Sequence, residues 1–207
     1  MAAGMDYRVL DDNTGYVRYE SFNNAIGSGN LDEVMMHLML CRGLIIDIRG
    51  NGGGQLTNAE KLAARFCNTT TLVGYYRHKT GPGHSDFSGL EERWLEPASG
   101  IRWQKPVVVL TNRQVYSAAN EFVMYMKELP GVTIVGDRTG GGAGMPFNSS
   151  LPNGWNVRFS AVPMYDARGN SCEFGIEPDY KVSLTDEDFA RGEDTIIEFA
   201  RTLLGRR

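Results

Sequence analysis

Residues 43–54 read Gly43-Leu44-Ile45-Ile46-Asp47-Ile48-Arg49-Gly50-Asn51-Gly52-Gly53-Gly54, an apolar run that ends in a charged pair and then in glycines. The apolar positions between 44 and 48 predict a strand that is buried on both faces of a sheet. The glycines allow positive φ angles and let the backbone approach another group closely. Backbone N–H groups presented in this way can bind an anion or an oxyanion. A plain tight turn from strand to helix explains the same pattern, and both interpretations stay open.

The composition is that of a globular domain with one core. The chain has 207 residues, of which 42% are hydrophobic and 22% charged. A formal net charge of -4 argues against a nucleic-acid surface, which needs clustered Lys and Arg. No apolar run approaches the roughly 20 residues of a membrane-spanning helix, and the first residues show no signal peptide. Three widely spaced cysteines favour buried apolar residues, so we expect no metal site and no cofactor.

Apolar strands alternate with amphipathic helices along most of the chain. Strands are expected at 15–20, 44–48, 71–76, 106–110 and 131–136, and helices at 30–39, 56–66, 117–128 and 195–204. This alternation predicts a mostly parallel sheet covered on both faces, in a single α/β domain. Asn153-Gly154 predicts a hairpin between residues 147–151 and 155–160. We expect residues 78–100 to be a long irregular surface excursion, and residues 1–15 to be an N-terminal remnant or linker ahead of a core at 16–207.

Ser117 stands where a buried strand leads into a helix. A hydroxyl there faces the positive end of the helix, and the next backbone N–H can point at an oxyanion. Serine is also a favoured N-cap that needs no catalytic role, and this alternative is the stronger one from local sequence alone. A catalytic serine needs a base. His78 and His84, on either side of a glycine turn in the 78–100 excursion, are the candidates within the chain, although a solvated loop accounts for them equally well.

Four motifs in a fixed order resemble those of the tail-specific, or carboxyl-terminal processing, serine peptidases. Residues 44–54 are similar to the family's apolar-Asp-x-Arg-x-Asn-Gly-Gly-Gly segment. Residues 107–121 are similar to its strand and nucleophile helix, residues 132–144 to its strand and Gly-x-x-Thr-x-Gly turn, and residues 174–179 to its closing Gly-Ile-x-Pro-Asp segment. The resemblance covers almost the whole chain after about residue 15. It implies a domain of ClpP/crotonase-like type with flanking helices and a C-terminal β-hairpin region.

The resemblance implies roles for particular residues. Ser117 falls on the nucleophile, and the amides of Ala118 and of Gly52 or Gly53 fall on the oxyanion hole. The peptidases with a Ser/Lys dyad carry a lysine in the second glycine turn, where this chain has Gly142. The chain is therefore closer to the tricorn-like branch and to retinoid-binding relatives. In that branch a histidine from a preceding segment is the base and a glutamate supports it, for which Glu173 is the candidate.

The leading hypothesis is a serine-type endopeptidase core that forms an acyl-enzyme on Ser117, with the base supplied by a missing N-terminal segment. We expect the isolated chain to have little or no activity. A catalytically inactive module that binds a peptide or an apolar ligand on the same scaffold is the alternative. A crotonase-like acyl-CoA enzyme is a weaker one, because it leaves the serine at the helix entry unexplained. The resemblance further implies a peptide or protein substrate and an extracytoplasmic location, in the bacterial periplasm or cell envelope; the oligomeric state stays open.

Overall fold

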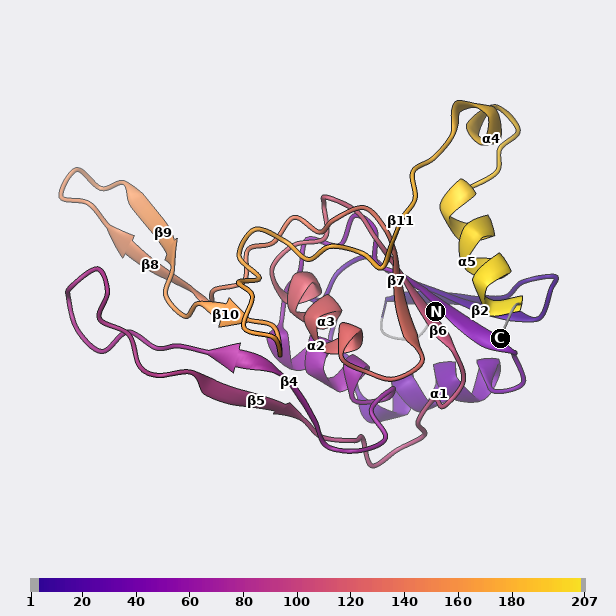
Figure 1. The fold of residues 1–207 in the computed structure, drawn as a ribbon, viewed down its shortest axis with the longest axis horizontal. Coiled ribbons are helices and arrows are strands. Elements are labelled where there is room, and N and C mark those ends of the chain that lie inside the picture. The colour runs from indigo at the N-terminus through magenta and orange to yellow at the C-terminus, as the bar shows by residue number, and fades with distance from the viewer. Residues whose placement is uncertain (1–3, 206–207) are drawn as a thin grey trace.

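The computed structural model describes residues 4–205, and its centre is a six-stranded sheet in the order β1-β2-β3-β6-β7-β11 (Figure 1). The strands are β1 (Met5–Val9), β2 (Thr14–Tyr19), β3 (Gly43–Asp47), β6 (Val107–Thr111), β7 (Val132–Gly136) and β11 (Tyr180–Lys181). All neighbours are parallel except β1 and β2, which form an antiparallel hairpin. Every residue of β3 and β6 is buried, which explains why their sequences are apolar up to the final Asp47 and Thr111 instead of alternating.

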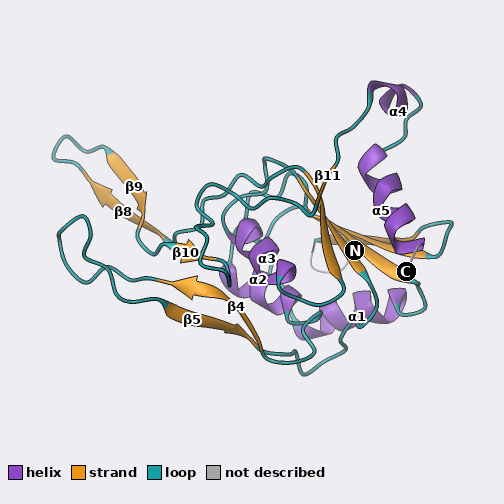
Figure 2. Cartoon of the chain, viewed as in Figure 1, coloured by secondary structure: helices purple, strands orange, loops and turns teal. Residues whose placement is uncertain are grey.

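Helices cover both faces of this sheet (Figure 2). On one face lie α1 (Ser28–Leu38), α2 (Leu56–Ala63) and α3 (Ala118–Lys127), which pack onto the larger core. On the other face lies α5 (Thr195–Gly205), whose Ile196, Ala200 and Leu204 pack against Ile45 and Val108. A short helix, α4 (Asp186–Ala190), precedes α5. The mixed α/β domain with a mostly parallel sheet and flanking helices is therefore confirmed.

Two smaller sheets lie beside this core. One has the order β10-β4-β5, with β4 (Thr71–Tyr76), β5 (Glu91–Leu95) and β10 (Met164–Tyr165). The other is the hairpin of β8 (Pro146–Ser150) and β9 (Asn156–Ser160), which surrounds Asn153-Gly154 as predicted and projects from the body of the molecule in Figure 1. In the described part of the chain no helix is both long and apolar enough to cross a membrane.

Three local expectations differ from the structure. Within the 78–100 excursion, β5 pairs antiparallel with β4; only its Leu95 is fully buried, so its charged sequence gave no strand pattern. Residues 1–15 were expected to be a remnant or linker, yet Met5–Val9 form an edge strand paired with β2. Helix α1 begins at Ser28 rather than after Asn30, because the Asn30 side chain accepts a hydrogen bond from the Gly27 N–H, 3.1 Å away.

The antiparallel β1 brings the start of the described chain to the carboxyl edge of the sheet. Met5 pairs with Tyr19, the last residue of β2. Gly4 lies so close to Asn24 that a Cβ on Gly4 would meet the Asn24 side chain at 2.2 Å. The other end of the chain leaves from the opposite edge, where Leu204 packs over Gly43 at the start of β3.

Candidate active site

Ser117 lies at the entry of α3 in a strained backbone conformation. Its φ of 57° and ψ of -125° place it outside the regions that residues with a side chain normally occupy. Such a conformation costs of order 1–3 kcal/mol and persists only where neighbouring structure enforces it. Ser117 holds the N-cap position, but its hydroxyl makes no capping hydrogen bond. The N-cap explanation that local sequence favoured therefore does not account for this serine.

Hydrogen bonds from two segments hold this conformation. The Ser117 N–H donates to the carbonyl of Gly141, 2.9 Å away in the second glycine turn. The preceding N–H, of Tyr116, donates to the carbonyl of Asn51 at 3.1 Å in the first glycine turn. The carbonyl of Ser117 accepts the first helical bond, from the Glu121 N–H at 3.0 Å. Both glycine turns thus fix the backbone of the serine.

The first glycine turn, residues 50–54, packs directly against Ser117. A Cβ on Gly53 would lie 2.6 Å from the Tyr116 carbonyl oxygen, 2.8 Å from Ser117 Cβ and 2.9 Å from the Ala118 nitrogen. Only glycine permits so close an approach, and the Gly53 φ of 99° independently favours glycine. The buried Asn51 holds the turn, since its Oδ1 accepts from the Gly53 N–H and its Nδ2 donates to the Tyr19 carbonyl, each at 2.9 Å.

Two backbone N–H groups beside Ser117 have no acceptor. Within residues 4–205, neither the Gly52 N–H nor the Ala118 N–H makes a hydrogen bond. The Gly53 N–H, in contrast, is already bonded to Asn51 Oδ1. Of the two glycines that sequence analysis placed in the oxyanion hole, Gly52 therefore has the available donor.

Two adjoining pockets open at Ser117. One, of about 460 Å³, is lined by Ser117, Glu121 and residues of both glycine turns. The other, of about 640 Å³, is lined by Ser117, Tyr116, Gly52 and Glu173 among others. The Glu173 carboxylate accepts a hydrogen bond from the Ser160 hydroxyl at 3.2 Å. The structure thus brings Glu173 to the same pocket as Ser117, although the two are 56 positions apart in the sequence.

A buried polar pair attaches the Glu173 segment to α3. The hydroxyl of Thr139 donates to Asn120 Oδ1 at 2.6 Å and accepts from the Ile176 N–H at 2.7 Å. Asn120 Nδ2 donates to the carbonyl of Cys172 at 3.1 Å. Because Asn120 and Thr139 are completely buried, these bonds fix the position of residues 172–176 relative to the helix that begins at Ser117.

The candidate histidine bases do not lie at these pockets. His78 and His84 belong to the β4–β5 loop, which Figure 1 shows extending away from α3 beyond the ends of its strands. His78 Nε2 lies 3.6 Å from Glu91 Oε2, within its own loop and strand. Among the described residues, no histidine and no lysine lines either pocket at Ser117. Neither histidine is brought to the serine.

The sequence analysis missed a buried glutamate, Glu121, at the same site. Glu121 is 1% exposed, and its Oε1 accepts hydrogen bonds from the hydroxyls of Tyr76, at 2.7 Å, and Tyr125. Burial raises the pKa of Glu121 above its ordinary value, against the opposing effect of these hydrogen bonds. The available sequence signal was its position four residues after Ser117, one turn further along the predicted helix.

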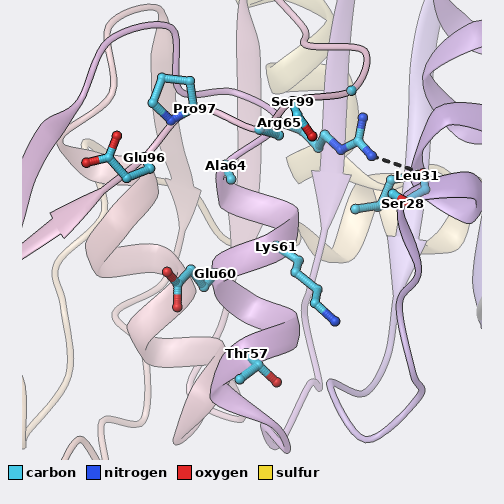
Figure 3. A pocket seen from close by; sticks show the side chains of 12 residues that line it. Ser28, Leu31, Thr57, Glu60, Lys61, Ala64, Arg65, Glu96, Pro97 and Ser99 are labelled. Atoms are coloured by element: carbon cyan, nitrogen blue, oxygen red, sulfur yellow. Dashed lines mark hydrogen bonds between the residues drawn. The ribbon is translucent and has the colours of Figure 1, made fainter.

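A further pocket, of about 560 Å³, lies apart from Ser117 between α2 and residues 96–100. Figure 3 shows Glu60 and Lys61 extending from α2 in different directions, with Glu96 and Pro97 across from them. Arg65, which lines the pocket, is buried and donates hydrogen bonds to the carbonyls of Ile101 and Ser28 at 2.8 and 2.9 Å. Most of the charged groups that line this pocket are already paired, so the pockets at Ser117 are the better candidates for an active site.

Comparisons with known proteins relate this chain to a family of peptidases. The model of peptidase family S41 matches residues 13–182. A solved structure of a candidate peptidase from Parabacteroides merdae ATCC 43184 is 51% identical with a TM-score of 0.95, covering 99% of this chain and 65% of that one.

Two curated relatives are more distant. The carboxy-terminal processing protease CtpA of Bacillus subtilis is 24% identical over 86% of this chain and 37% of its own length. The chloroplastic C-terminal processing peptidase of Tetradesmus obliquus is 25% identical over 87% of this chain and 38% of its own. The chain thus spans less than two fifths of the length of these two relatives.

Proposed function

Because this chain belongs to peptidase family S41, we propose that it is the catalytic core of a serine-type peptidase that cleaves peptide bonds through an acyl-enzyme on Ser117. The observation that carries the proposal is the strained Ser117, whose hydroxyl caps nothing and whose backbone both glycine turns hold in place. Strain of this kind gathers at functional sites, where it aims a reactive group. A tight turn alone would need neither the strain nor the uncapped hydroxyl.

In the proposed reaction, Ser117 Oγ attacks the carbonyl carbon of the substrate peptide while a base takes the hydroxyl proton. The carbonyl oxygen becomes an oxyanion, which the free N–H groups of Gly52 and Ala118 stabilise. Removal of one such donor typically costs about 3 kcal/mol of the barrier. The base then protonates the leaving amine, and water releases the acyl group from Ser117 in a second step.

The base is proposed to come from a segment outside residues 4–205. None of the described residues that line the two pockets at Ser117 is a histidine or a lysine. Glu173, which lines the larger pocket, is placed to orient an incoming imidazole, as the resemblance implied. The place of this chain in the tricorn-like branch and an extracytoplasmic location remain predictions, as does the processing of protein tails suggested by the relatives.

A fluorophosphonate probe tests the nucleophile. We expect it to label Ser117 in a longer protein that joins this chain to the proposed base-bearing segment, here called the longer protein. It should label the 207-residue chain alone far more slowly and leave the Ser117→Ala variant of the longer protein unlabelled. Absence of labelling in the longer protein would contradict the proposal.

The lack of a histidine or lysine among the described residues that line these pockets also favours a second candidate, a module that binds peptides without cleaving them. It predicts no labelling of the longer protein, together with a peptide affinity that Ser117→Ala leaves unchanged. Loss of peptide hydrolysis in the same variant would exclude this module.

A further inference from the structure

One carboxylate oxygen in the pocket beside Ser117 has no partner. Glu121 follows Ser117 by one turn of α3, and both residues line the pocket of about 460 Å³. Its Oε1 accepts hydrogen bonds from two tyrosine hydroxyls. Its Oε2 is shielded from water and accepts a hydrogen bond from no residue in the described part of the chain.

A buried oxygen of this kind calls for an explanation, because buried polar groups in native proteins almost always have a partner. The protein does not supply one from its own nearby cation. The Arg93 guanidinium lies over the rings of Tyr76 and Tyr125, each at 5.9 Å. It pairs with Glu60 at 2.5 Å and donates to the Tyr125 hydroxyl at 3.3 Å, and among the described residues no hydrogen bond joins it to Glu121.

The pocket around Glu121 has mainly apolar walls. Leu56, Ala143, Met145 and Met164 line it, and Ala143 and Met164 are buried. The positive charge at this pocket is that of Arg158, an exposed residue of the projecting hairpin. Apolar walls with an unpartnered carboxyl oxygen among them suit a side chain that has a long aliphatic stem and a cationic N–H donor at its tip.

We propose that Glu121 is a specificity-determining residue and that this pocket takes a lysine side chain of the substrate, from the residue on the acyl side of the cleaved bond. The lysine stem packs against the apolar walls, and its ammonium reaches Glu121 Oε2 as a small side-chain adjustment opens that oxygen to the pocket. This inference rests on the proposed function, because it assumes that the acyl group is held on Ser117 beside the pocket.

Binding of product peptides tests the inference without requiring turnover. Two acetylated tetrapeptides, identical except for a C-terminal lysine or norleucine, differ only in the ammonium group. We expect the lysine peptide to bind the protein at least about tenfold more tightly, because norleucine would leave the buried carboxylate unpaired. Equal affinities, tighter binding of norleucine, or no measurable binding of either peptide would overturn the inference.

Two variants separate the carboxylate from the general charge of the pocket. Glu121→Gln should reduce the lysine preference to below about threefold, whereas Arg158→Gln should leave it within about twofold of the parental value. Because the preference is a ratio measured within each variant, partial loss of folded protein does not change it. A lysine preference that survives Glu121→Gln would contradict a direct contact with Glu121. Changes of equal size and opposite direction in the two variants would contradict it as well, because they would reflect only the net charge of the pocket.

Labelling of Ser117 by the fluorophosphonate probe shows whether a failed test concerns the lysine pocket or the proposed peptidase function. Labelling of Ser117 without a lysine preference means that the inference fails while the nucleophile stands. A lysine preference without labelling in the longer protein means that the pocket is assigned correctly while the peptidase proposal fails.

Discussion

Replacement of Gly53 by alanine should disable the site while Gly52→Ala leaves it intact. At position 53 the new Cβ would lie 2.6 Å from a carbonyl oxygen, 2.8 Å from Ser117 Cβ and 2.9 Å from the Ala118 nitrogen. Each distance is well below ordinary van der Waals contact, and two of the three atoms belong to the backbone that holds the serine. At position 52 nothing lies within 4 Å, and the backbone does not require positive φ.

The magnitude follows from two costs. Alanine at the Gly53 φ of 99° is strained by about 1–2 kcal/mol, and relief of the overlap adds about 1–3 kcal/mol. For a domain of 207 residues, a total of about 3 kcal/mol lowers the melting temperature by about 6–12 °C. The overlap moves Ser117 or the Ala118 N–H, and loss of one oxyanion donor slows acylation by about 10²–10³-fold.

The assay is the rate of fluorophosphonate labelling of the longer protein, measured at a temperature where both variants remain folded. Gly52→Ala keeps the backbone N–H and should label within about threefold of the parent. A Gly53→Ala variant that labels at the parental rate and melts at the parental temperature would refute the packing of the glycine turn against Ser117.

Three further outcomes follow from the structure. Asp47→Asn should cost about 3 kcal/mol, measured by denaturant unfolding, because it breaks a fully buried carboxylate's bonds to Arg49 at 2.6 and 2.9 Å. Burial acts to raise the pKa of Asp47, but Arg49 outweighs burial and holds the pKa below its ordinary value. The stabilisation from Asp47 is therefore present above pH of about 4 and is lost as the pH falls through the lowered pKa of Asp47 in the folded protein. The Asp47→Asn variant should lose most of this pH dependence. Cys172, whose pKa burial raises to about 12, should resist iodoacetamide at pH 8 until denaturant is added, as mass spectrometry would show. His78→Ala and His84→Ala should each leave Ser117 labelling within about twofold, and a tenfold loss in either would restore that histidine as a base.

The large elements and the position of Ser117 at a helix entry were predictable because each depends on a local pattern. Apolar runs such as those of β3 and β6 are typical of strands that are buried on both faces of a sheet. Their alternation with helices then predicts parallel pairing. The edge strand β5 was not predictable in the same way. Of its five residues only Leu95 is fully buried, so its pairing with β4 depends on the backbone rather than on a hydrophobic pattern.

The site was predicted in part for a comparable reason. Glycines and a serine at strand ends carry their own signal, and their order along the chain added to it. The approach of Glu173 to Ser117 depends on the buried Asn120 and Thr139, whose contacts join distant segments and leave no periodic trace. Glu121 was missed because a carboxylate in a helix is usually solvated, and only packing shows that tyrosines surround it.

The antiparallel β1 has a consequence for how a base could be delivered. Gly4 lies against Asn24, and the neighbouring Asn23 lines the larger pocket at Ser117. Any polypeptide joined upstream of this point starts beside the pocket that Ser117 lines, whereas one joined downstream of α5 starts at the opposite edge of the sheet. An imidazole on a short upstream tether would therefore act at a high effective concentration, commonly of millimolar order for short linkers, and would need little intrinsic affinity for the core. A histidine-bearing segment intended to supply a base should therefore be fused upstream of Gly4 and not downstream of α5.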